Sequence, residues 1–544
     1  MDNQNIENIT SIKDIKSIFI NILPIFYKLK NSIGITSFCA YRIKRKYGTV
    51  VFDKYLHINN DYFKVKTLFK RGIGFSFKKY KYYFNLYNVK INKDEILNYP
   101  PQNLIKVSFK RDDNEIIMPV VYNLLHRQVY KGKTSKVYKI NKDLVCYFRQ
   151  AKLNSIALTV RSSNTTDKFS HRCKILFAKL LSMITPKSDI TLLYEKGANK
   201  YEESAATLYE RLIDLGYQNS HFIIKKDSKH VEFIKERYKK NIIWAYTFNH
   251  YYKWFKCRKF IGTESVPHSM ELRAANQYIT KKMIKKKYKQ VFLQHGVMYM
   301  VALDSVSRSA FRKGGNEQPI DAKIVVSSKK EADHFVELGG FDYEDLYISG
   351  LPFYDRTIKK PEADKIVIML TWRPWDYNVI VSDYKKSTYY KMTKKIINSI
   401  PSEYKDKVYI LPHPLILNKF RNTDLDKWIP EILSYDKILE DTALLITDYS
   451  SIAYSAFYRG SNIIFCWEEL HECMEKYGSH LMLNDKNVFG DVSYQYEDLA
   501  KLMKKNYLKP QTEKYKKKYK SIVTFSDNKN TDRLIEFLKK DNMI

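Results

Sequence analysis

Residues 443–451 read ALLITDYSS, an apolar run followed at once by an aspartate and two serines. The run is short and rich in branched aliphatic residues, as in a strand buried on both faces of a parallel sheet. Apolar runs that end in a polar turn recur on both sides of it. After residue 361 they are KIVIML (365–370), VYIL (408–411) and NIIFCW (462–467). With helices between them, these runs predict a parallel α/β sheet.

A second set of such runs lies before residue 361 and has the same rhythm. Its strands are expected at ITLLYE (190–195), HFIIKK (221–226), NIIWAY (241–246), KFIGT (259–263), VFLQHG (291–296), KIVVSS (323–328) and YISGLP (347–352). Helices are expected between them, at 201–215 and 329–339. Two sets in tandem predict two Rossmann-like domains that face a cleft, over residues 166–360 and 361–544.

Residues 48–165 show a different pattern, with short alternating runs rich in Val, Phe, Tyr and Thr. This alternation, with turn-like segments such as RDDNE (111–115), predicts a β-rich accessory domain. Residues 1–47 predict a helical and basic arm. Within it, SIFINILPIFY (17–27) is too short to span a bilayer. We expect this stretch either at a membrane interface or as a helix packed on the protein's own surface.

The charge of the 544 residues is strongly positive. Lys and Arg count 94 against 59 Asp and Glu, a formal net charge of +35. This favours a polyanionic partner, although a compositional bias that also enriches Ile, Asn and Tyr explains the excess equally well. A hydrophobic content of 44% excludes global disorder. The six cysteines form no CxxC pair, which is typical of a reducing compartment.

Two histidines stand where ligands bind in open parallel sheets, at the carboxyl ends of strands. His295 and Gly296 follow the apolar run at 291–293. A histidine there can act as a general base, and glycine allows a close approach of the backbone. His413 lies between two prolines that limit its mobility. A histidine that only fills a gap in the core, or a plain turn, is the alternative in each case.

Groups suited to phosphate stand at two further strand ends. Thr371 and Arg373 follow KIVIML, and arginine offers a bidentate grip on phosphate; a plain surface arginine is the alternative. Asp448 precedes Ser450 and Ser451 at an expected helix start. Hydroxyls and free N–H groups there favour an anion, and a simple helix cap is the alternative.

Together and in this order, these segments resemble the CDP-glycerol glycerophosphotransferases of teichoic acid and capsule synthesis. The motifs that carry the resemblance are LQHGV (293–297), SGLPFYD (349–355), LTWRP (370–374), PHP (412–414) and ITDYSSIAYS (446–455). The flanking segments YEKGANKYEESAATLYERL (194–212) and TFSDNKNTDRLIEFL (524–538) extend it to roughly residues 190–539.

The chain departs from the family pattern at named positions. Phe353 stands where the family has arginine, Ser455 where it has aspartate, and Met300 lies near the place of a lysine that often follows the HG motif. These departures indicate a donor other than CDP-glycerol, such as CDP-ribitol, or a divergent or inactive member.

The resemblance implies a glycosyltransferase-B-like fold and the transfer of a polyol phosphate, most simply glycerol phosphate, from a CDP-linked donor to a hydroxyl of a growing surface polymer. CMP is released. His295, as the general base, and His413 are the implied catalytic residues. The implied donor-binding residues are Gly296, Val297, Thr371, Arg373, Asp448, Ser450, Ser451 and Ser455. No cofactor and no metal are expected, because no Asp, Glu or His cluster with metal-ligand spacing stands out.

The expected partners are the CDP-polyol donor on the second Rossmann-like domain and a lipid-linked or polymeric, phosphate-rich acceptor on the first. An anionic membrane surface is also expected, which predicts a cytoplasmic protein bound peripherally to the inner face of the membrane. A sugar-nucleotide-dependent glycosyltransferase on the same fold stays open as an alternative. A nucleic-acid-binding protein is disfavoured, because the basic residues are spread along the chain without a recognised binding motif.

Overall fold

The computed structural model describes residues 20–44, 53–58, 61–67, 73–97, 99, 102–111, 114–119, 137–150, 156–186, 188–270, 288–304, 310–315, 321–371, 373–413, 416–421, 423–431 and 435–544. The chain divides into two compact units. The first extends to Arg172, and the second holds the described residues from Cys173 onward.

The first unit is built from antiparallel sheets. One sheet joins β1 (Ile20–Lys28), β2 (Ser32–Lys44), β7 (Tyr80–Asn92) and β5 (Lys66–Thr67), with β6 (Ile73–Phe77) also paired to β7. The other joins β10 (Tyr138–Lys139), β11 (Leu144–Gln150), β12 (Ile156–Ser162), β8 (Gln102–Arg111), β3 (Asp53–Ile58) and β4 (Asp61–Lys64), with β9 (Asn114–Pro119) on β8. A short helix, α2 (Lys93–Leu97), follows β7. Apolar side chains of both sheets share one core, in which Ile91 and Phe148 are buried.

The helical arm expected over residues 1–47 is wrong for its described part. Ile20–Lys28 and Ser32–Lys44 form an antiparallel pair, with Ile20 opposite Tyr41. Isoleucine, phenylalanine and tyrosine are frequent in β1, and such residues favour strands. Pro24 has no amide hydrogen to donate and is tolerated because β1 forms an edge of its sheet.

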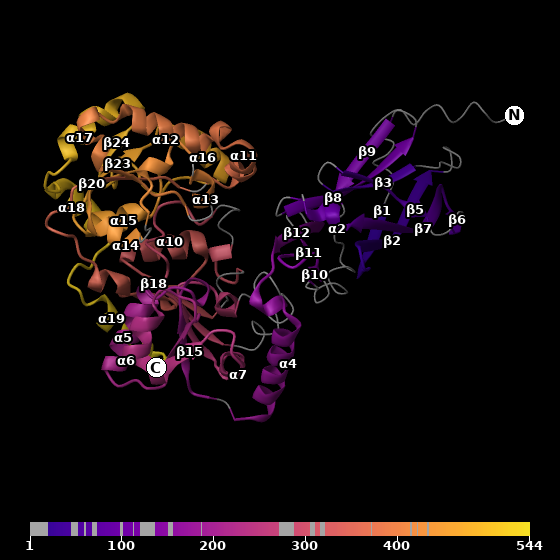
Figure 1. Ribbon diagram of the computed structural model, residues 1–544, viewed down its shortest axis with the longest axis horizontal. Helices are drawn as coiled ribbons and strands as arrows, with labels where there is room; N and C mark the ends of the chain where they lie inside the picture. The colour runs from indigo at the N-terminus through magenta and orange to yellow at the C-terminus, as the bar shows by residue number, and fades with distance from the viewer. Residues whose placement is uncertain are drawn as a thin grey trace. The chain divides into compact units, whose positions relative to one another are not determined.

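The second unit begins at Cys173, within helix α4 (Phe169–Ile184). A seven-stranded parallel sheet follows this helix. The strand order is β15 (Ile242–Trp244), β14 (Ser220–Ile224), β13 (Thr191–Tyr194), β16 (Lys259–Gly262), β17 (Lys289–Phe292), β18 (Ala322–Val326) and β19 (Leu346–Ile348). The helices between the strands are α5 (Ser204–Asp214), α6 (Val231–Tyr238), α7 (Phe248–Lys256) and α10 (Lys329–Gly339) (Figure 1). Because β16 lies between β13 and β17, the carboxyl ends of β13 and β17 are one strand apart.

A second parallel sheet follows, with five strands. Its order is β21 (Val408–Ile410), β20 (Lys365–Met369), β22 (Thr442–Thr447), β23 (Asn462–Cys466) and β24 (Asp491–Ser493). Its helices are α11 (Tyr377–Asp383), α12 (Thr388–Ser399), α13 (Leu417–Phe420), α14 (Tyr435–Glu440), α15 (Ile452–Tyr458), α16 (Leu470–Tyr477) and α17 (Leu499–Asn506). Figure 1 shows α12, α16 and α17 around this sheet. The mixed α/β class with parallel sheets, predicted from the apolar runs, is confirmed.

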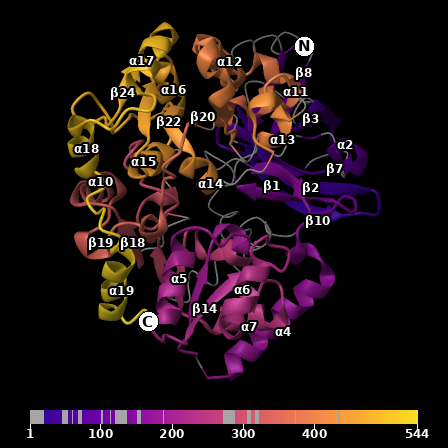
Figure 2. The same cartoon turned by 60° about the vertical axis from the view of Figure 1, so that its left-hand side comes forward.

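The chain then returns to the first sheet through α18 (Glu513–Lys520) and α19 (Asn530–Lys540). Figures 1 and 2 both show α19 beside α5. The ring of Phe537 on α19 stacks on Tyr347 of β19, with ring centroids 4.9 Å apart. Thr191, the first residue of β13, donates its hydroxyl hydrogen to the carbonyl of Met543 at 2.6 Å. The last helix is therefore part of the first sheet's packing.

The SGLPFYD segment (349–355) binds the start of α19 through hydrogen bonds. Asp355 accepts hydrogen bonds from the backbone amides of Asn530, at 2.9 Å, and Thr531, at 2.6 Å, at the start of α19. Gly350 has a φ of +81°, and a Cβ built on it would lie 1.9 Å from Asn530 Oδ1. The glycine of this motif is therefore required by backbone conformation and by the closeness of α19.

Candidate functional site

The histidine loop of the first sheet and the serine loop of the second sheet meet. His295 and Gly296 follow β17, and Ser451 stands directly before α15, which follows β22. A Cβ built on Gly296 would lie 3.6 Å from Ser451 Oγ, so one added carbon atom would be enough to bring the two loops into van der Waals contact. Two motifs far apart in the sequence thus face each other at the carboxyl ends of their strands.

The loop after β17 is held by a buried carboxylate of α10. Gln294 has a φ of +61° and donates from its side-chain amide to the carbonyl of Val325. Glu331 accepts from the backbone amides of Met298 at 2.7 Å and Ser327 at 2.6 Å. Burial raises the pKa of Glu331 to about 7, although these hydrogen bonds oppose the shift. The sequence did not single out Glu331, because its place beside this loop depends on strand order.

The imidazole of His295 faces a carboxylate from the loop after β13. His295 Nδ1 lies 3.5 Å from Glu203 Oε2, and the histidine side chain is 44% exposed. Glu203 is the N-cap residue of α5, and its amide donates to the buried Glu195 at 3.0 Å. Burial alone would raise the pKa of Glu203, but the ammonium of Lys196 and the contact with His295 lower it. The histidine therefore has an ionised partner on one side and an open side for substrate.

His413 follows β21, which is an edge strand of the second sheet. Its backbone carbonyl accepts from the amides of Ile416 at 2.9 Å and Leu417 at 3.1 Å, at the start of α13. Burial, and after it the ammonium of Lys196, lower the pKa of His413 and favour its neutral form. Lys196 in turn forms an ion pair with Glu203.

Arg373, which the sequence predicts as a phosphate contact, has a fully buried side chain. Its Nη2 lies 3.3 Å from Asp448 Oδ2 and 3.2 Å from Tyr449 Oη, and its Nη1 donates to the carbonyl of Thr371 at 3.1 Å. Burial would lower the pKa of Arg373, but the carboxylate of Asp448 raises it. The physical reason is that β20 and β22 are neighbours, so their polar ends face each other and the buried charges pair.

Three other predicted donor contacts also have their side chains engaged within the protein. Asp448 Oδ1 accepts from the Thr371 amide at 2.9 Å and from the Thr371 hydroxyl at 2.6 Å. Val297 is fully buried in an apolar core. Ser450 is half-buried, whereas Ser451 is exposed. The two serines are therefore at least partly exposed, whereas the Asp448 carboxylate is engaged by Thr371 and Arg373.

These loops lie in a region of the chain that matches a known protein family. The sequence model described as CDP-Glycerol:Poly(glycerophosphate) glycerophosphotransferase matches residues 177–540, which include every loop described above. The chain belongs to this family. The resemblance drawn from the sequence motifs is confirmed.

Known proteins are similar to this glycerophosphotransferase-family chain. The minor teichoic acid biosynthesis protein GgaB of Bacillus subtilis (strain 168) is 26% identical over 375 residues, which are 63% of this chain. The chain spans only 39% of the length of GgaB. A structure of the wall teichoic acid polymerase TagF matches with a TM-score of 0.47 and 15% identity, over 70% of this chain and 98% of that one. A putative UDP-N-acetylglucosamine 2-epimerase from Listeria monocytogenes matches with a TM-score of 0.37 and 11% identity, over 66% and 97%.

Two of the three departures from the glycerophosphotransferase pattern, Phe353 and Ser455, lie around one buried tyrosine. The ring of Phe353 is 4.2 Å from that of Tyr354, centroid to centroid. Burial raises the pKa of Tyr354, and the Ser455 hydroxyl beside the phenol opposes this shift. The Ser455 hydroxyl, which the sequence predicts as a donor contact, thus lies beside Tyr354. Phe353 and Ser455 replace an arginine and an aspartate of the family pattern, so both positions are neutral in this chain. Both side chains lie beside Tyr354.

No metal centre is apparent in the part of the chain that the structure describes. There, no group of three or more His, Cys, Asp or Glu side chains is arranged to hold a metal ion. One Asp-x-Asp triplet, at 424–426, is occupied by protein groups. Asp424 accepts from the Tyr390 hydroxyl and from Lys394, and Asp426 accepts from Arg421.

Proposed function

We propose that this chain transfers a polyol phosphate, most simply glycerol phosphate, from a CDP-linked donor to a hydroxyl of a growing teichoic acid or capsule polymer, with release of CMP. The observation that carries the proposal is the approach of Gly296 to Ser451, with His295 beside it. This geometry places a proton acceptor, His295, near the serine hydroxyls at the start of α15. Membership of the glycerophosphotransferase family supports the same chemistry.

The proposed arrangement is glycosyltransferase-B-like. The two parallel sheets act as Rossmann-like domains, because each presents its polar loops at the carboxyl ends of its strands. The donor then binds mainly at the loops of the second sheet and the acceptor at the loops of the first. The antiparallel sheets of the first unit serve as an accessory domain.

In the proposed mechanism, the acceptor hydroxyl attacks the distal phosphorus of the donor. A bond forms from the acceptor oxygen to this phosphorus, and the bond to the bridging oxygen of CMP breaks. His295 takes the proton of the hydroxyl, an effect worth about 10²–10⁴-fold. His413, Ser450 and Ser451 hold the diphosphate and offset the charge that develops on CMP. Arg373 acts indirectly, by keeping Asp448 in place under the serine loop.

The proposal is tested by incubating the purified protein with CDP-glycerol, CDP-ribitol or UDP-sugars, together with a polymer acceptor, and analysing the products by mass spectrometry. We expect polymer extended by polyol phosphate units and release of CMP. Extension from UDP-sugars alone would identify a sugar-nucleotide-dependent glycosyltransferase. A salt-dependent gel shift with nucleic acid, in the absence of transfer, would favour the nucleic-acid alternative.

The serine loop gives a prediction about binding. Changing Ser450 and Ser451 together to alanine is expected to weaken CDP binding by at least about 30-fold, because each of the two hydroxyl contacts to a charged phosphate contributes roughly 1 kcal/mol or more. Isothermal titration calorimetry with CDP measures the change. Ser382→Ala on α11, where the exposed hydroxyl donates only to a backbone carbonyl, is the matched control. Unchanged affinity in the folded double variant would reduce the motif to a helix cap.

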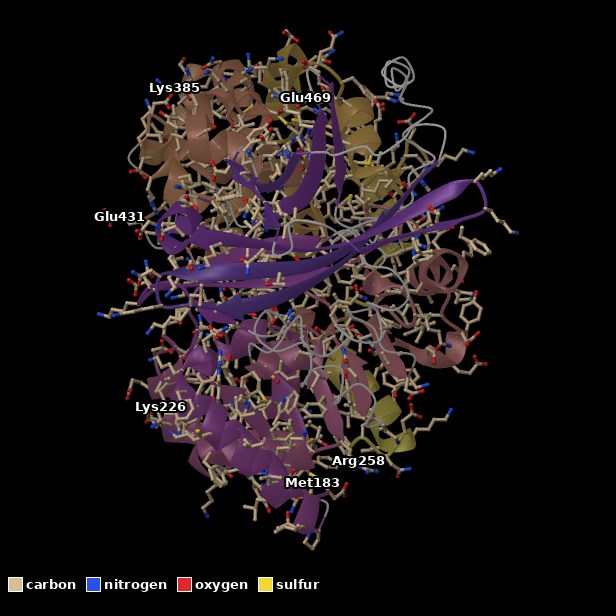
Figure 3. All side chains as sticks on the ribbon, turned by 90° about the vertical axis from the view of Figure 1, so that its right-hand side faces the viewer. Met183, Lys226, Arg258, Lys385, Glu431 and Glu469 are labelled. Carbon is tan, nitrogen blue, oxygen red and sulfur yellow. The ribbon has the colours of Figure 1, made fainter. Side chains whose placement is uncertain are left out.

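We also propose peripheral binding to an anionic membrane on the cytoplasmic face, where a lipid-linked acceptor would be met. Two described features support it. Helix α18 reads EKYKKKYK, and its lysines add to the net charge of +35. Helix α4, on which Figure 3 labels Met183, exposes a set of large apolar side chains. These are Phe169, Leu176, Phe177, Leu180, Leu181, Met183 and Ile184. In the described residues, no helix has the length and apolar character needed to cross a bilayer.

Membrane binding is expected to depend on the lysines of α18. Changing Lys516, Lys517 and Lys518 together to glutamate should weaken binding to vesicles that contain anionic lipid, because each lysine near such a surface contributes about 1 kcal/mol. Sedimentation with vesicles measures it, and vesicles of neutral lipid are the control. Binding should fall as salt rises, since the attraction is screened within ~8 Å at physiological ionic strength. A protein that ignores anionic vesicles at low salt would contradict the proposal.

A further inference from the structure

The turn after β13 holds a lysine in an uncommon backbone conformation. Three consecutive residues have positive φ, with Lys196 at 28°, Gly197 at 63° and Ala198 at 59°. Such values are costly for residues with a side chain and persist only where the surroundings enforce them. Here Glu264 accepts from the Gly197 amide at 2.6 Å, and the Lys225 amide donates to the Ala198 carbonyl at 2.7 Å. The turn therefore fixes where the Lys196 side chain begins.

The ammonium of Lys196 lies among the groups of the transfer site. It forms an ion pair with Glu203, whose other contact is His295. Its influence also reaches His413 on the second sheet. Burial would lower the pKa of Lys196, but Glu203 raises it and keeps the ammonium charged. The side chain is nevertheless 41% exposed, so a ligand can reach it.

A CDP-linked donor brings a diphosphate into this site, and its negative charge needs a cation. Arg373 cannot serve, because it is fully buried and paired with Asp448. Lys196 is charged and reachable, and it pairs with the same carboxylate, Glu203, that His295 faces. An ammonium is suited to phosphate as a compact charge that can change partners.

We propose that Lys196 binds a phosphate of the donor, and that its ammonium leaves Glu203 for a phosphate oxygen when the donor enters. The inference rests on the proposed function and adds a residue outside the histidine, arginine and serine motifs. The exchange moves no proton and breaks no covalent bond. Once released, Glu203 has His295 as its remaining partner, so donor binding would orient the general base for the acceptor hydroxyl.

The test measures binding of CDP and of inorganic pyrophosphate by calorimetry at low salt. Lys196→Met is expected to bind CDP about 10- to 100-fold more weakly, because a hydrogen bond between charged groups is lost. Lys200→Met is the matched control, since Lys200 lies in the same loop and its ammonium pairs with Glu202 instead. The control should bind CDP within about twofold of the wild type.

Two further variants distinguish ligand exchange from a structural ion pair. Glu203→Gln removes the competitor for the ammonium, so exchange predicts CDP binding at least as tight as in the wild type. A structural pair would instead make Glu203→Gln and Lys196→Met weaken binding alike. Lys196→Arg keeps the charge and should recover part of the affinity, which keeps the test valid if Lys196→Met fails to fold.

CDP binding by Lys196→Met within twofold of the wild type, in a folded protein, would overturn the inference. Equal weakening by Glu203→Gln would overturn it as well. Neither measurement requires turnover. If no CDP-polyol is a substrate while the binding differences hold, the proposed function fails and the phosphate contact of Lys196 stands. If transfer occurs but Lys196→Met binds CDP normally, only the inference about Lys196 fails.

Discussion

His295→Ala is expected to lower kcat for polyol phosphate transfer by at least about 100-fold, because the acceptor hydroxyl loses the group that takes its proton. The affinity for CDP should change little, since the imidazole lies on the first sheet and faces Glu203. Steady-state kinetics with CDP-glycerol measure kcat, and calorimetry measures CDP binding. A fall in kcat with intact donor binding separates a proton acceptor from a donor-binding group.

His471→Ala is the matched control for this prediction. His471 is exposed on α16, outside the loops that meet around Gly296, and its removal should leave kcat within about twofold. The assignment of His295 as the base would be wrong if His295→Ala turned over within a few fold of the wild type. A loss confined to CDP affinity would instead assign His295 to donor binding.

Arg373→Met is expected to have the largest effect on stability, about 3–5 kcal/mol. The guanidinium is fully buried, and its removal leaves the Asp448 carboxylate buried without its cation. Urea unfolding followed by circular dichroism measures the free energy of unfolding of the second unit. Adding Asp448→Asn should recover part of the loss, because the uncompensated charge is then gone.

Arg237→Met serves as the control for stability. Arg237 is about half exposed, and its Nη2 lies 3.8 Å from Asp214, so its loss should cost no more than about 0.5–1 kcal/mol. If Arg373→Met destabilised the protein as little as this control, the ion pair with Asp448 would not be what holds the serine loop. In that case Arg373 could turn outward, and the original expectation of a phosphate contact would return.

Much of the α/β architecture could be predicted from the sequence because the pattern there is local. Short apolar runs ending in a polar turn became β17, β20 and β22, and the segment 329–339 became α10 at the expected residues. Residues 17–27 were harder, because a short apolar run fits a helix or a strand equally well. The run forms a strand because it pairs with Ser32–Lys44. This pairing cannot be recognised from the run alone.

The candidate site was predictable only where the residue itself follows a strand. His295, His413 and Ser451 could be found in this way. The burial of Arg373 could not, because it depends on β20 lying next to β22, which brings Asp448 to it. Glu203 and Lys196 were missed for the same reason, since they reach His295 from β13 across β16. Strand order is a property of the whole fold and leaves no mark on a single motif.

The packing of α19 against the first sheet sets an order of events during synthesis. The strand β19 is complete at Ile348, but the helix that covers its Tyr347 begins roughly 180 residues later, at Asn530. At ~5–20 residues per second, the ribosome needs about 10–40 s to produce it. During that time the second sheet is synthesised, and the side of the first sheet that α19 covers is not yet packed. The sheet that is synthesised first therefore completes its packing last, when α19 has been made.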